Sequence, residues 1–213
     1  MGRHAQTRGG RWSACFGPDR ERNVTFTDPR SWVPDVRWDE IDPDAAMGEI
    51  VCRFLDTYGP ACHEDFGRWW GTDAASARRI FAAHSDAMVQ VDVDGRKAWL
   101  PAEGAGASGN DNARGVLLLP GFDPYVVAPI SARAYTIPHG YVDRVSRTAG
   151  WISPVLVVDG VIRGVWTHEL AGGRLAIEVE PFSRITKAVR TTAEEYAQRY
   201  GILLDAKVVM TWT

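Results

Sequence analysis

The chain has 213 residues, of which 45% are hydrophobic and 24% are charged, a balance typical of one large globular domain or two small ones. No apolar run approaches the length of about 18 residues that a membrane-spanning helix needs, so the sequence excludes such a helix. The net charge of −3 counts mildly against nucleic-acid binding. The three cysteines are scattered, which excludes a disulfide framework and indicates a reducing compartment. We expect this compartment to be the cytoplasm.

The N-terminal part of the chain, residues 1–37, predicts a β-hairpin. Residues 9–17 form the first short strand and residues 23–26 its partner across a turn. Because a lone hairpin is marginal in water, we interpret this part as the remnant of a domain whose beginning is missing. Residues 32–43 contain several prolines and predict a linker.

The next segment predicts three helices in succession. Residues 45–58 place apolar side chains at helical spacing, including Ile50, Phe54 and Leu55, after a capping Asp44. Shorter helices follow at about 62–70, which buries Phe66 and Trp69 or Trp70, and at about 73–83. Each predicted helix is bounded by residues typical of helix ends: Asp at its start, or Gly or Pro just after its last residue.

A hairpin over residues 88–100, turned at Asp94-Gly95, follows the third helix. Three helices with a tight turn between the second and third, followed by a hairpin, predict a winged helix at 40–100 rather than a generic three-helix bundle. Residues 101–115 are rich in Gly, Ala and Asn and predict a linker.

The C-terminal part, residues 116–213, is predicted to be β-rich. Strands are expected at 116–120, 155–158, 161–167 and 175–179, and a last strand at 206–212 closes the sheet. One helix, at about 185–200, ends at Gly201. The predicted fold class is therefore α+β: a winged helix followed by a barrel-like β domain with a C-terminal helix and a closing strand.

Several segments together resemble the winged-helix DNA-binding family that includes the AlkZ-like crosslink-repair DNA glycosylases. The resemblance rests on these segments, in chain order: Cys15-Phe16-Gly17-Pro18; residues 54–61 (FLDTYGPA); Asp65-Phe66; Trp69-Trp70-Gly71; residues 118–125 (LLPGFDPY); and residues 154–166 (PVLVVDGVIRGVW).

The resemblance implies tandem winged helices around a β-barrel, with duplex DNA as the ligand. In the glycosylase branch of the family, a Gln-x-Gln or Gln-x-Asp motif in the N-terminal winged helices positions the water that hydrolyses the glycosidic bond of an alkylated base. We expect the matching segment to be absent here, which makes this an N-terminally truncated member with no assignable catalytic residue.

Four local motifs resemble functional sites, and each has a simpler explanation. Gln90-Val91-Asp92 spells Gln-x-Asp but falls on a wing strand, away from the family's motif position. The Gly-x-Gly-x-x-Gly pattern at 104–109 follows a hairpin instead of a lone strand, so it is a linker. Cys62-His63 and Cys52 lack the spacing of a zinc site, and His139 and His168 have no nucleophile nearby.

The function that we expect is binding of duplex DNA, including alkylated DNA. The third helix would lie in the major groove and the wing would reach phosphates, through the following side chains: Ser76, Arg78, Arg79, Arg96 and Lys97. Because residues 38–100 carry six basic and twelve acidic side chains, the contact must be local and salt-sensitive.

No metal or organic cofactor is expected. Two alternatives remain open: a glycosylase for bulky alkylated bases once an N-terminal half is supplied, and an inactive truncated remnant. A DNA-bound protein would be associated with the nucleoid.

Overall fold

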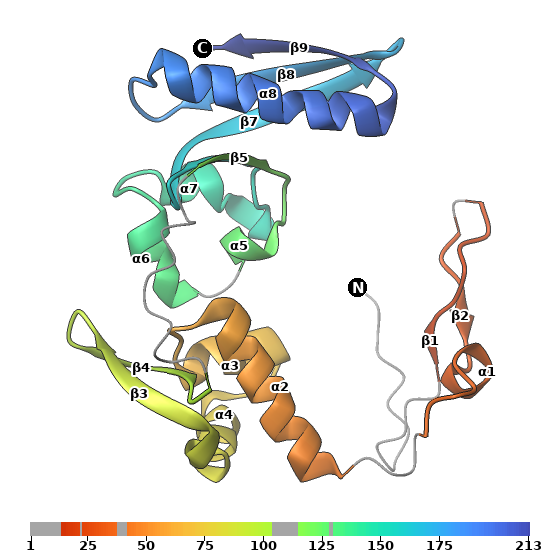
Figure 1. The fold of residues 1–213 in the computed structure, drawn as a ribbon, viewed down its shortest axis with the longest axis vertical. Coiled ribbons are helices and arrows are strands. Elements are labelled where there is room, and N and C mark those ends of the chain that lie inside the picture. The colour runs from red at the N-terminus through yellow and green to blue at the C-terminus, as the bar shows by residue number, and fades with distance from the viewer. Residues whose placement is uncertain (1–13, 22, 38–41, 104–114, 128–129) are drawn as a thin grey trace. The chain divides into compact units, whose positions relative to one another are not determined.

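The computed structural model describes residues 14–21, 23–37, 42–103, 115–127 and 130–213 (Figure 1). The chain divides into two compact units, Met1–Met47 and Gly48–Thr213. Within the described ranges, no helix is long and apolar enough to cross a membrane. The predicted glycine-rich pattern at 104–109, and most of the linker predicted at 101–115, lie outside the described residues.

The first unit contains a short hairpin. Strand β1 (Cys15–Phe16) pairs antiparallel with β2 (Phe26–Thr27), and their two phenylalanine rings stack with centroids 5.3 Å apart. This confirms the predicted hairpin in its described part, whereas residues 9–13 of the first strand lie outside it. Helix α1 (Pro29–Trp32) follows, although no helix was predicted there. Its four residues are too few to show helical periodicity, and Asp28 caps it by accepting a hydrogen bond from the Arg30 amide.

Three helices and a hairpin form the next part of the chain. Helices α2 (Pro43–Tyr58), α3 (His63–Trp70) and α4 (Ala74–Ala83) confirm the three predicted helices to within two residues. Strands β3 (Met88–Val93) and β4 (Arg96–Pro101) pair antiparallel. Asp94 and Gly95 connect them with φ values of 51° and 79°, the left-handed conformation that this type of tight turn requires.

An aromatic core holds these helices together. Phe54 of α2 packs edge-on against Phe66 of α3, which in turn contacts Phe81 of α4. All three side chains are buried. The apolar face predicted for α2 is confirmed at Phe54 and Leu55, whereas Ile50 is only half-buried. The prediction that Trp69 or Trp70 is buried is wrong, because their side chains are 43% and 44% exposed. Both lie at the rim of the aromatic core and place part of each ring against Phe66.

The remainder of the second unit is built on a five-stranded sheet. Its strands are β5 (Val116–Leu119), β6 (Val155–Val158), β7 (Val161–Ala171), β8 (Arg174–Pro181) and β9 (Lys207–Trp212), hydrogen-bonded in that order. Every pair is antiparallel except β8–β9, which is parallel. The predicted strands are confirmed, but the last one does not close the sheet, because β9 pairs with β8 and leaves β5 at the opposite edge.

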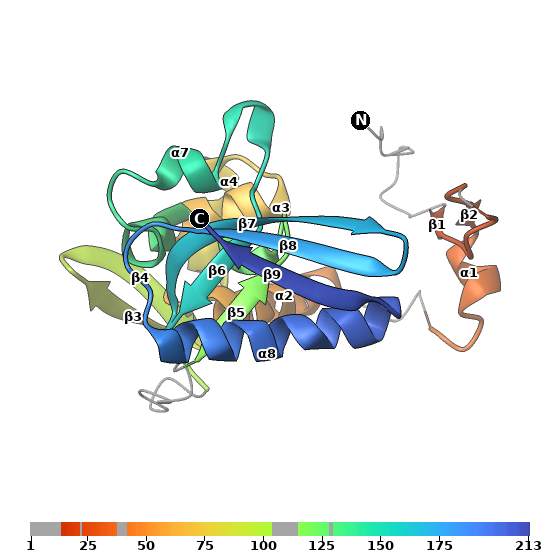
Figure 2. The same cartoon turned by 90° about the horizontal axis from the view of Figure 1, so that it is seen from above.

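Helix α8 (Lys187–Leu204) lies along one face of the sheet (Figure 2). The prediction that it ends at Gly201 is wrong, since the helix continues to Leu204 and Asp205 adopts the left-handed capping conformation. Gly201 is required for close packing instead. A Cβ atom there would lie 2.6 Å from Val208 Cγ2 and 2.8 Å from the Ala206 carbonyl oxygen.

The opposite face of the sheet is covered by a helical segment that was not predicted. Among the described residues between β5 and β6 there are five short helices: α5 (Pro124–Val127), η3 (Ile130–Ala132), α6 (Arg133–Thr136), α7 (Val142–Val145) and η4 (Thr148–Gly150). Val126, Ile137 and Val145 from this segment pack against Val155 and Val157 of β6, whereas Leu156 between them faces α8. Each helix has only three or four residues, too few for a periodic signal.

Candidate nucleic-acid interface

The turn between α3 and α4 is tight. Gly71 ends α3 in the left-handed conformation with φ of 82°, and its amide donates to the Gly67 carbonyl. A Cβ atom on Gly67 would lie 3.0 Å from Ala77 Cβ, so the absence of a side chain lets the two helices approach closely. The turn and the contact fix the direction of α4 relative to α3.

A polar network organises the first turn of α4. The carboxylate of Asp73 caps the helix by accepting from the Ser76 amide at 2.9 Å and from the Ser76 hydroxyl at 2.7 Å. These two hydrogen bonds hold the pKa of Asp73 below its usual value. Arg79 donates to the Ser76 hydroxyl oxygen at 2.9 Å. The structure therefore brings Ser76 and Arg79, two of the five predicted DNA-contacting residues, into one network.

Arg78 and Arg79 are both exposed on α4, while their neighbours Ala77 and Phe81 are buried. The described part of the chain provides no hydrogen bond or ion pair for Arg78. The outer surface of α4 thus carries one arginine fixed by Ser76 and one that extends freely into solvent.

The other two predicted residues lie on the hairpin β3–β4. Arg96 and Lys97 are consecutive in β4, so their side chains leave opposite faces of the hairpin. Arg96 donates to the carbonyl oxygen of Ser131 at 3.2 Å. Lys97 is exposed and lies opposite Asp92 across the hairpin. The structure does not bring Arg96 and Lys97 together on one face.

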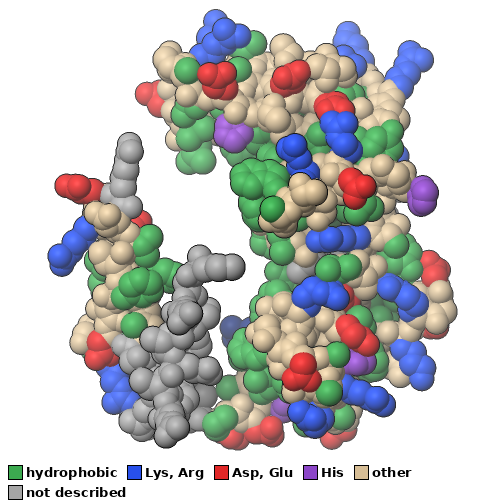
Figure 3. Space-filling view, turned by 180° about the vertical axis from the view of Figure 1, so that it is seen from behind, with side chains coloured by type: hydrophobic (Ala, Val, Ile, Leu, Met, Phe, Trp, Pro, Cys, Tyr) green, Lys and Arg blue, Asp and Glu red, His purple; other side chains and the backbone are tan. Residues whose placement is uncertain are grey.

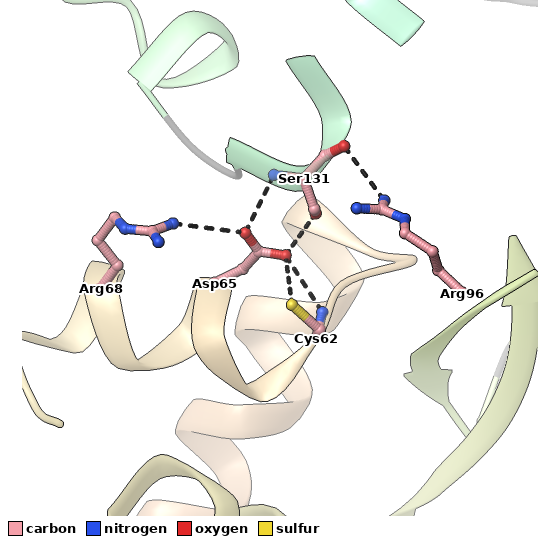
Figure 4. Close-up of polar contacts among 5 residues, drawn as sticks. All are labelled: Cys62, Asp65, Arg68, Arg96 and Ser131. Carbon is pink, nitrogen blue, oxygen red and sulfur yellow. Dashed lines mark hydrogen bonds and ion pairs between the residues drawn. The ribbon is translucent and has the colours of Figure 1, made fainter. Parts of the chain in front are cut away.

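The side chain of Asp65 in α3 is the hub that joins this part of the chain to the helical segment between β5 and β6 (Figure 4). It is almost fully buried, with 4% of the residue exposed. Its carboxylate accepts from the amide and thiol of Cys62, at 3.3 Å and 3.0 Å, and from the amide of Ser131 at 3.1 Å. The Ser131 hydroxyl also donates to it. Arg68, one turn along α3, forms an ion pair with Asp65 at 3.8 Å.

The hydrogen bonds at this hub decide which groups are charged. Burial alone would raise the pKa of Asp65, but the bonds from Cys62 and Ser131 outweigh it and hold that pKa below its ordinary value. Burial, together with the hydrogen bond to Asp65, raises the pKa of Cys62 to about 12. Asp65 is therefore an anion at neutral pH and Cys62 a neutral thiol that donates to it.

The sequence does not predict that Asp65, Arg68 and Ser131 form a connected group. A local signal for part of it does exist. Cys62-x-x-Asp65 has the spacing of a capping box, in which the residue before a helix and the third residue within it bond reciprocally, and the structure forms this box. The contact with Ser131 joins residues 66 positions apart, and no local pattern specifies it.

The other motifs form no catalytic arrangement in the described residues. Gln90 and Asp92 are both exposed on β3, and the Asp92 carboxylate accepts from the Gly95 amide at 2.8 Å, a bond of the hairpin turn. No group of three His, Cys, Asp or Glu side chains suitable for a metal ion occurs in this part of the chain, and Cys52 and Cys62 are free thiols.

A hollow of about 390 Å³ lies on the sheet between β7, β8 and β9. Its lining includes His168, Arg174 and two glutamates, Glu169 and Glu178. The two carboxylates oppose the approach of a phosphate, so the hollow is a poor candidate for contact with a nucleic-acid backbone. Elsewhere on the second unit, Lys and Arg side chains recur from the helical part to the sheet on the face shown in Figure 3, with acidic side chains among them.

Three comparisons relate the chain to known proteins. The family described as DNA glycosylase AlkZ-like matches residues 3–202. The sequence is 35% identical over 195 residues to an interstrand DNA cross-link repair glycosylase of Streptomyces sahachiroi. The aligned residues are 88% of this chain and 52% of that protein. The solved structure of Streptomyces sahachiroi DNA glycosylase AlkZ aligns with a TM-score of 0.75 and 32% identity over 95% of this chain and 55% of that one. The chain thus spans about half the length of these relatives.

Proposed function

The chain belongs to the AlkZ-like DNA glycosylase family, and we propose that it binds duplex DNA through a winged helix. In this proposal α2, α3 and α4 are the three helices of the winged helix, and β3–β4 is the wing. Helix α4 is the recognition helix that enters the major groove. The observation that carries the proposal is the outer surface of α4, where Arg78 and Arg79 are exposed beside the capped first turn.

The arrangement of α3 and α4 supports this assignment. In a helix-turn-helix, the second helix reads the groove while the first crosses the DNA backbone, and the angle between them must be fixed. The left-handed Gly71 and the close contact between Gly67 and Ala77 fix that angle here. The network of Asp73, Ser76 and Arg79 orders the first turn of α4, the turn whose residues would contact base edges.

The charge distribution determines how this contact would behave. Arg78, Arg79 and Lys97 provide three exposed cations within a segment that is acidic as a whole. Binding would therefore rest on a few phosphate contacts and weaken steeply with salt, by a log–log slope of about 0.9 per phosphate neutralised.

Substitution of these three cations tests the proposal. Changing Arg78, Arg79 and Lys97 together to Ala should weaken duplex binding and reduce the slope of log affinity against log salt by about 2 to 3 units, measured by fluorescence anisotropy. A matched control replaces Arg163, Arg184 and Lys187, three exposed cations elsewhere, and should leave the slope close to that of the parent. An equal slope in the two triple variants would contradict the proposal.

Base excision is the second candidate function, favoured by the name of the curated relative, an interstrand DNA cross-link repair glycosylase. Excision requires a residue that positions water beside a flipped nucleotide. Gln90 and Asp92, the one local match to the family's motif, are a poor source of that water, because Asp92 is engaged with Gly95 in the wing turn. We propose that this chain contributes DNA binding to repair of alkylated or crosslinked DNA, and that Gln90 has no catalytic part.

An assay for free base released from alkylated duplex tests this second point. The purified protein of 213 residues should release no base above the uncatalysed rate. Release that is lost in Gln90→Ala would move the active site to the wing. Release that persists in Gln90→Ala would show that this chain contains a different excision site.

A further inference from the structure

Two arginines flank the contact between Asp65 and Ser131. Arg68 lies one turn after Asp65 in α3, and Arg133 follows Ser131 by two residues and begins α6. Since the Asp65–Ser131 hydrogen bonds join α3 to the η3–α6 segment, they also bring the two arginines near one another. Figure 4 shows Arg68 on one side of this contact and Arg96 of the wing on the other.

The positive charge of this arginine pair is not balanced by the residues around it. The Asp65 carboxylate already accepts four hydrogen bonds, two from Cys62 and two from Ser131, so it contributes only the long ion pair of 3.8 Å to Arg68. The Arg68 side chain is 56% exposed. Nε of Arg133 is buried and has no hydrogen-bond partner within the described part of the chain.

Burial and the charge of Arg68 both lower the pKa of Arg133, which is the direction that an under-compensated guanidinium takes. By contrast, Arg96 on the other side of the hub has a hydrogen-bond partner. It donates to the Ser131 carbonyl, and both Arg96 and the carboxylate of Asp94 lie within interaction range of Tyr135 in α6. The guanidinium nitrogen without a partner in the described residues therefore belongs to Arg133, and Arg68 is the second cation beside it.

A buried polar group without a partner, beside a second cation, is the state expected of a site whose anionic ligand is absent. The guanidinium forks of two arginines match the several oxygens of one phosphate group better than a single carboxylate does. We propose that Arg68 and Arg133 together bind one phosphodiester of the DNA backbone. This inference rests on the proposed function and adds a contact made by α3 and α6, outside α4 and the wing.

The position of Arg68 on α3 agrees with that ligand. In a helix-turn-helix, the helix that precedes the recognition helix crosses the DNA backbone, so a phosphate is the group that it would meet. Arg133 comes from a segment that the winged helix does not include. The phosphate contact would consequently clamp the helical segment between β5 and β6 to the same duplex.

The test uses the full chain and the variant Arg68→Gln/Arg133→Gln in two arms. The first arm measures the melting temperature in inorganic phosphate and in chloride at equal ionic strength and pH. The second arm measures duplex affinity by fluorescence anisotropy over a series of salt concentrations. The control variant, Arg147→Gln/Arg163→Gln, removes two exposed arginines that have no ion pair among the described residues. Near-ultraviolet circular dichroism checks that each variant is folded.

The parent and the control should be stabilised by phosphate, and the Arg68/Arg133 variant should lose this stabilisation. The same variant should bind duplex about tenfold or more weakly, with a log–log slope lower by about 0.9 for one phosphate lost. The single variant Arg133→Lys keeps the charge but not the guanidinium fork. It should have the salt slope of the parent and a duplex affinity between those of the parent and the double variant.

Each other outcome has a defined meaning. A double variant that is folded and has the slope of the parent would overturn the inference and leave the proposed function intact. A loss of phosphate stabilisation without any change in duplex binding would assign the site to a free anion, which also overturns it. If the parent itself does not bind duplex, the proposed function fails, and the inference that this site holds a DNA phosphate fails with it.

Discussion

The substitution Asp65→Ala tests whether the hub between α3 and the η3–α6 segment is a major source of stability. It leaves the amides of Cys62 and Ser131 without their acceptor in a buried place. A buried donor without an acceptor costs about 1–3 kcal/mol, so the two amides predict a loss of about 2–6 kcal/mol in the free energy of unfolding. For a protein of this size, each kcal/mol lowers the melting temperature by about 2–4 °C. Calorimetry and urea denaturation measure both quantities.

The pH dependence gives a second readout of the same interaction. The pKa of Asp65 is lowered in the folded protein, so its contribution to stability is complete above the ordinary carboxyl pKa of about 4 and is lost as the pH falls through the lower folded value. The variant Asp65→Asn should therefore lose less stability than the parent as the pH falls below about 4. Asp56→Ala, an exposed position on α2, is the control. A melting temperature for Asp65→Ala within about 2 °C of the parent would show that the Asp65 hub is not a major source of stability.

Three further predictions concern the core, a close approach and a thiol. Leu55→Ala should cost about 2–5 kcal/mol in urea denaturation, because the side chain is 1% exposed; an unchanged midpoint would show that this face of α2 is not core. Gly201→Ala should lower the melting temperature despite the higher helix propensity of Ala, because its Cβ atom would collide with Val208 and the Ala206 carbonyl; a rise would contradict that packing. Cys62 should react with iodoacetamide about a thousandfold more slowly in the native protein than in urea, because burial raises the pKa of its thiol to about 12. Equal rates would show that the thiol is not shielded in the folded protein.

Long periodic segments and tight turns could be predicted from the sequence. The apolar spacing around Phe54 and Leu55 predicts α2, and alternation together with Asp94-Gly95 predicts the hairpin β3–β4, because each signal is repeated over many residues or requires a specific backbone conformation. The five sheet strands were predicted for the same reason. The place of β9 was not, since the choice of partner strand depends on contacts distant in sequence.

The short helices between β5 and β6 could not be predicted, and neither could the hub that depends on them. Ser131 lies in a three-residue helix with no periodic pattern, and its contact with Asp65 exists only in the folded chain. The role of Gly201 is ambiguous in the sequence for a related reason. A glycine near the end of a helix commonly marks its C-terminus, but the same residue type also serves where another segment approaches closely, and sequence alone does not distinguish the two.

Of the five predicted DNA-contacting residues, the sequence placed Arg78 and Arg79 on an exposed helix, as the structure has them. Arg96 and Lys97 are adjacent in the sequence and were predicted to contact phosphate together. Side chains alternate along a strand, however, so these two leave opposite faces of the hairpin. Whether these residues contact DNA stays a prediction.

Binding of duplex DNA by this chain is best measured by an anisotropy titration of the unmodified protein against a labelled duplex and its separated strand. We expect saturable binding that favours the duplex and weakens steeply between about 50 and about 200 mM salt. Absence of duplex binding at the lowest salt, or equal affinity for duplex and single strand, would show that the chain is not a duplex-binding protein.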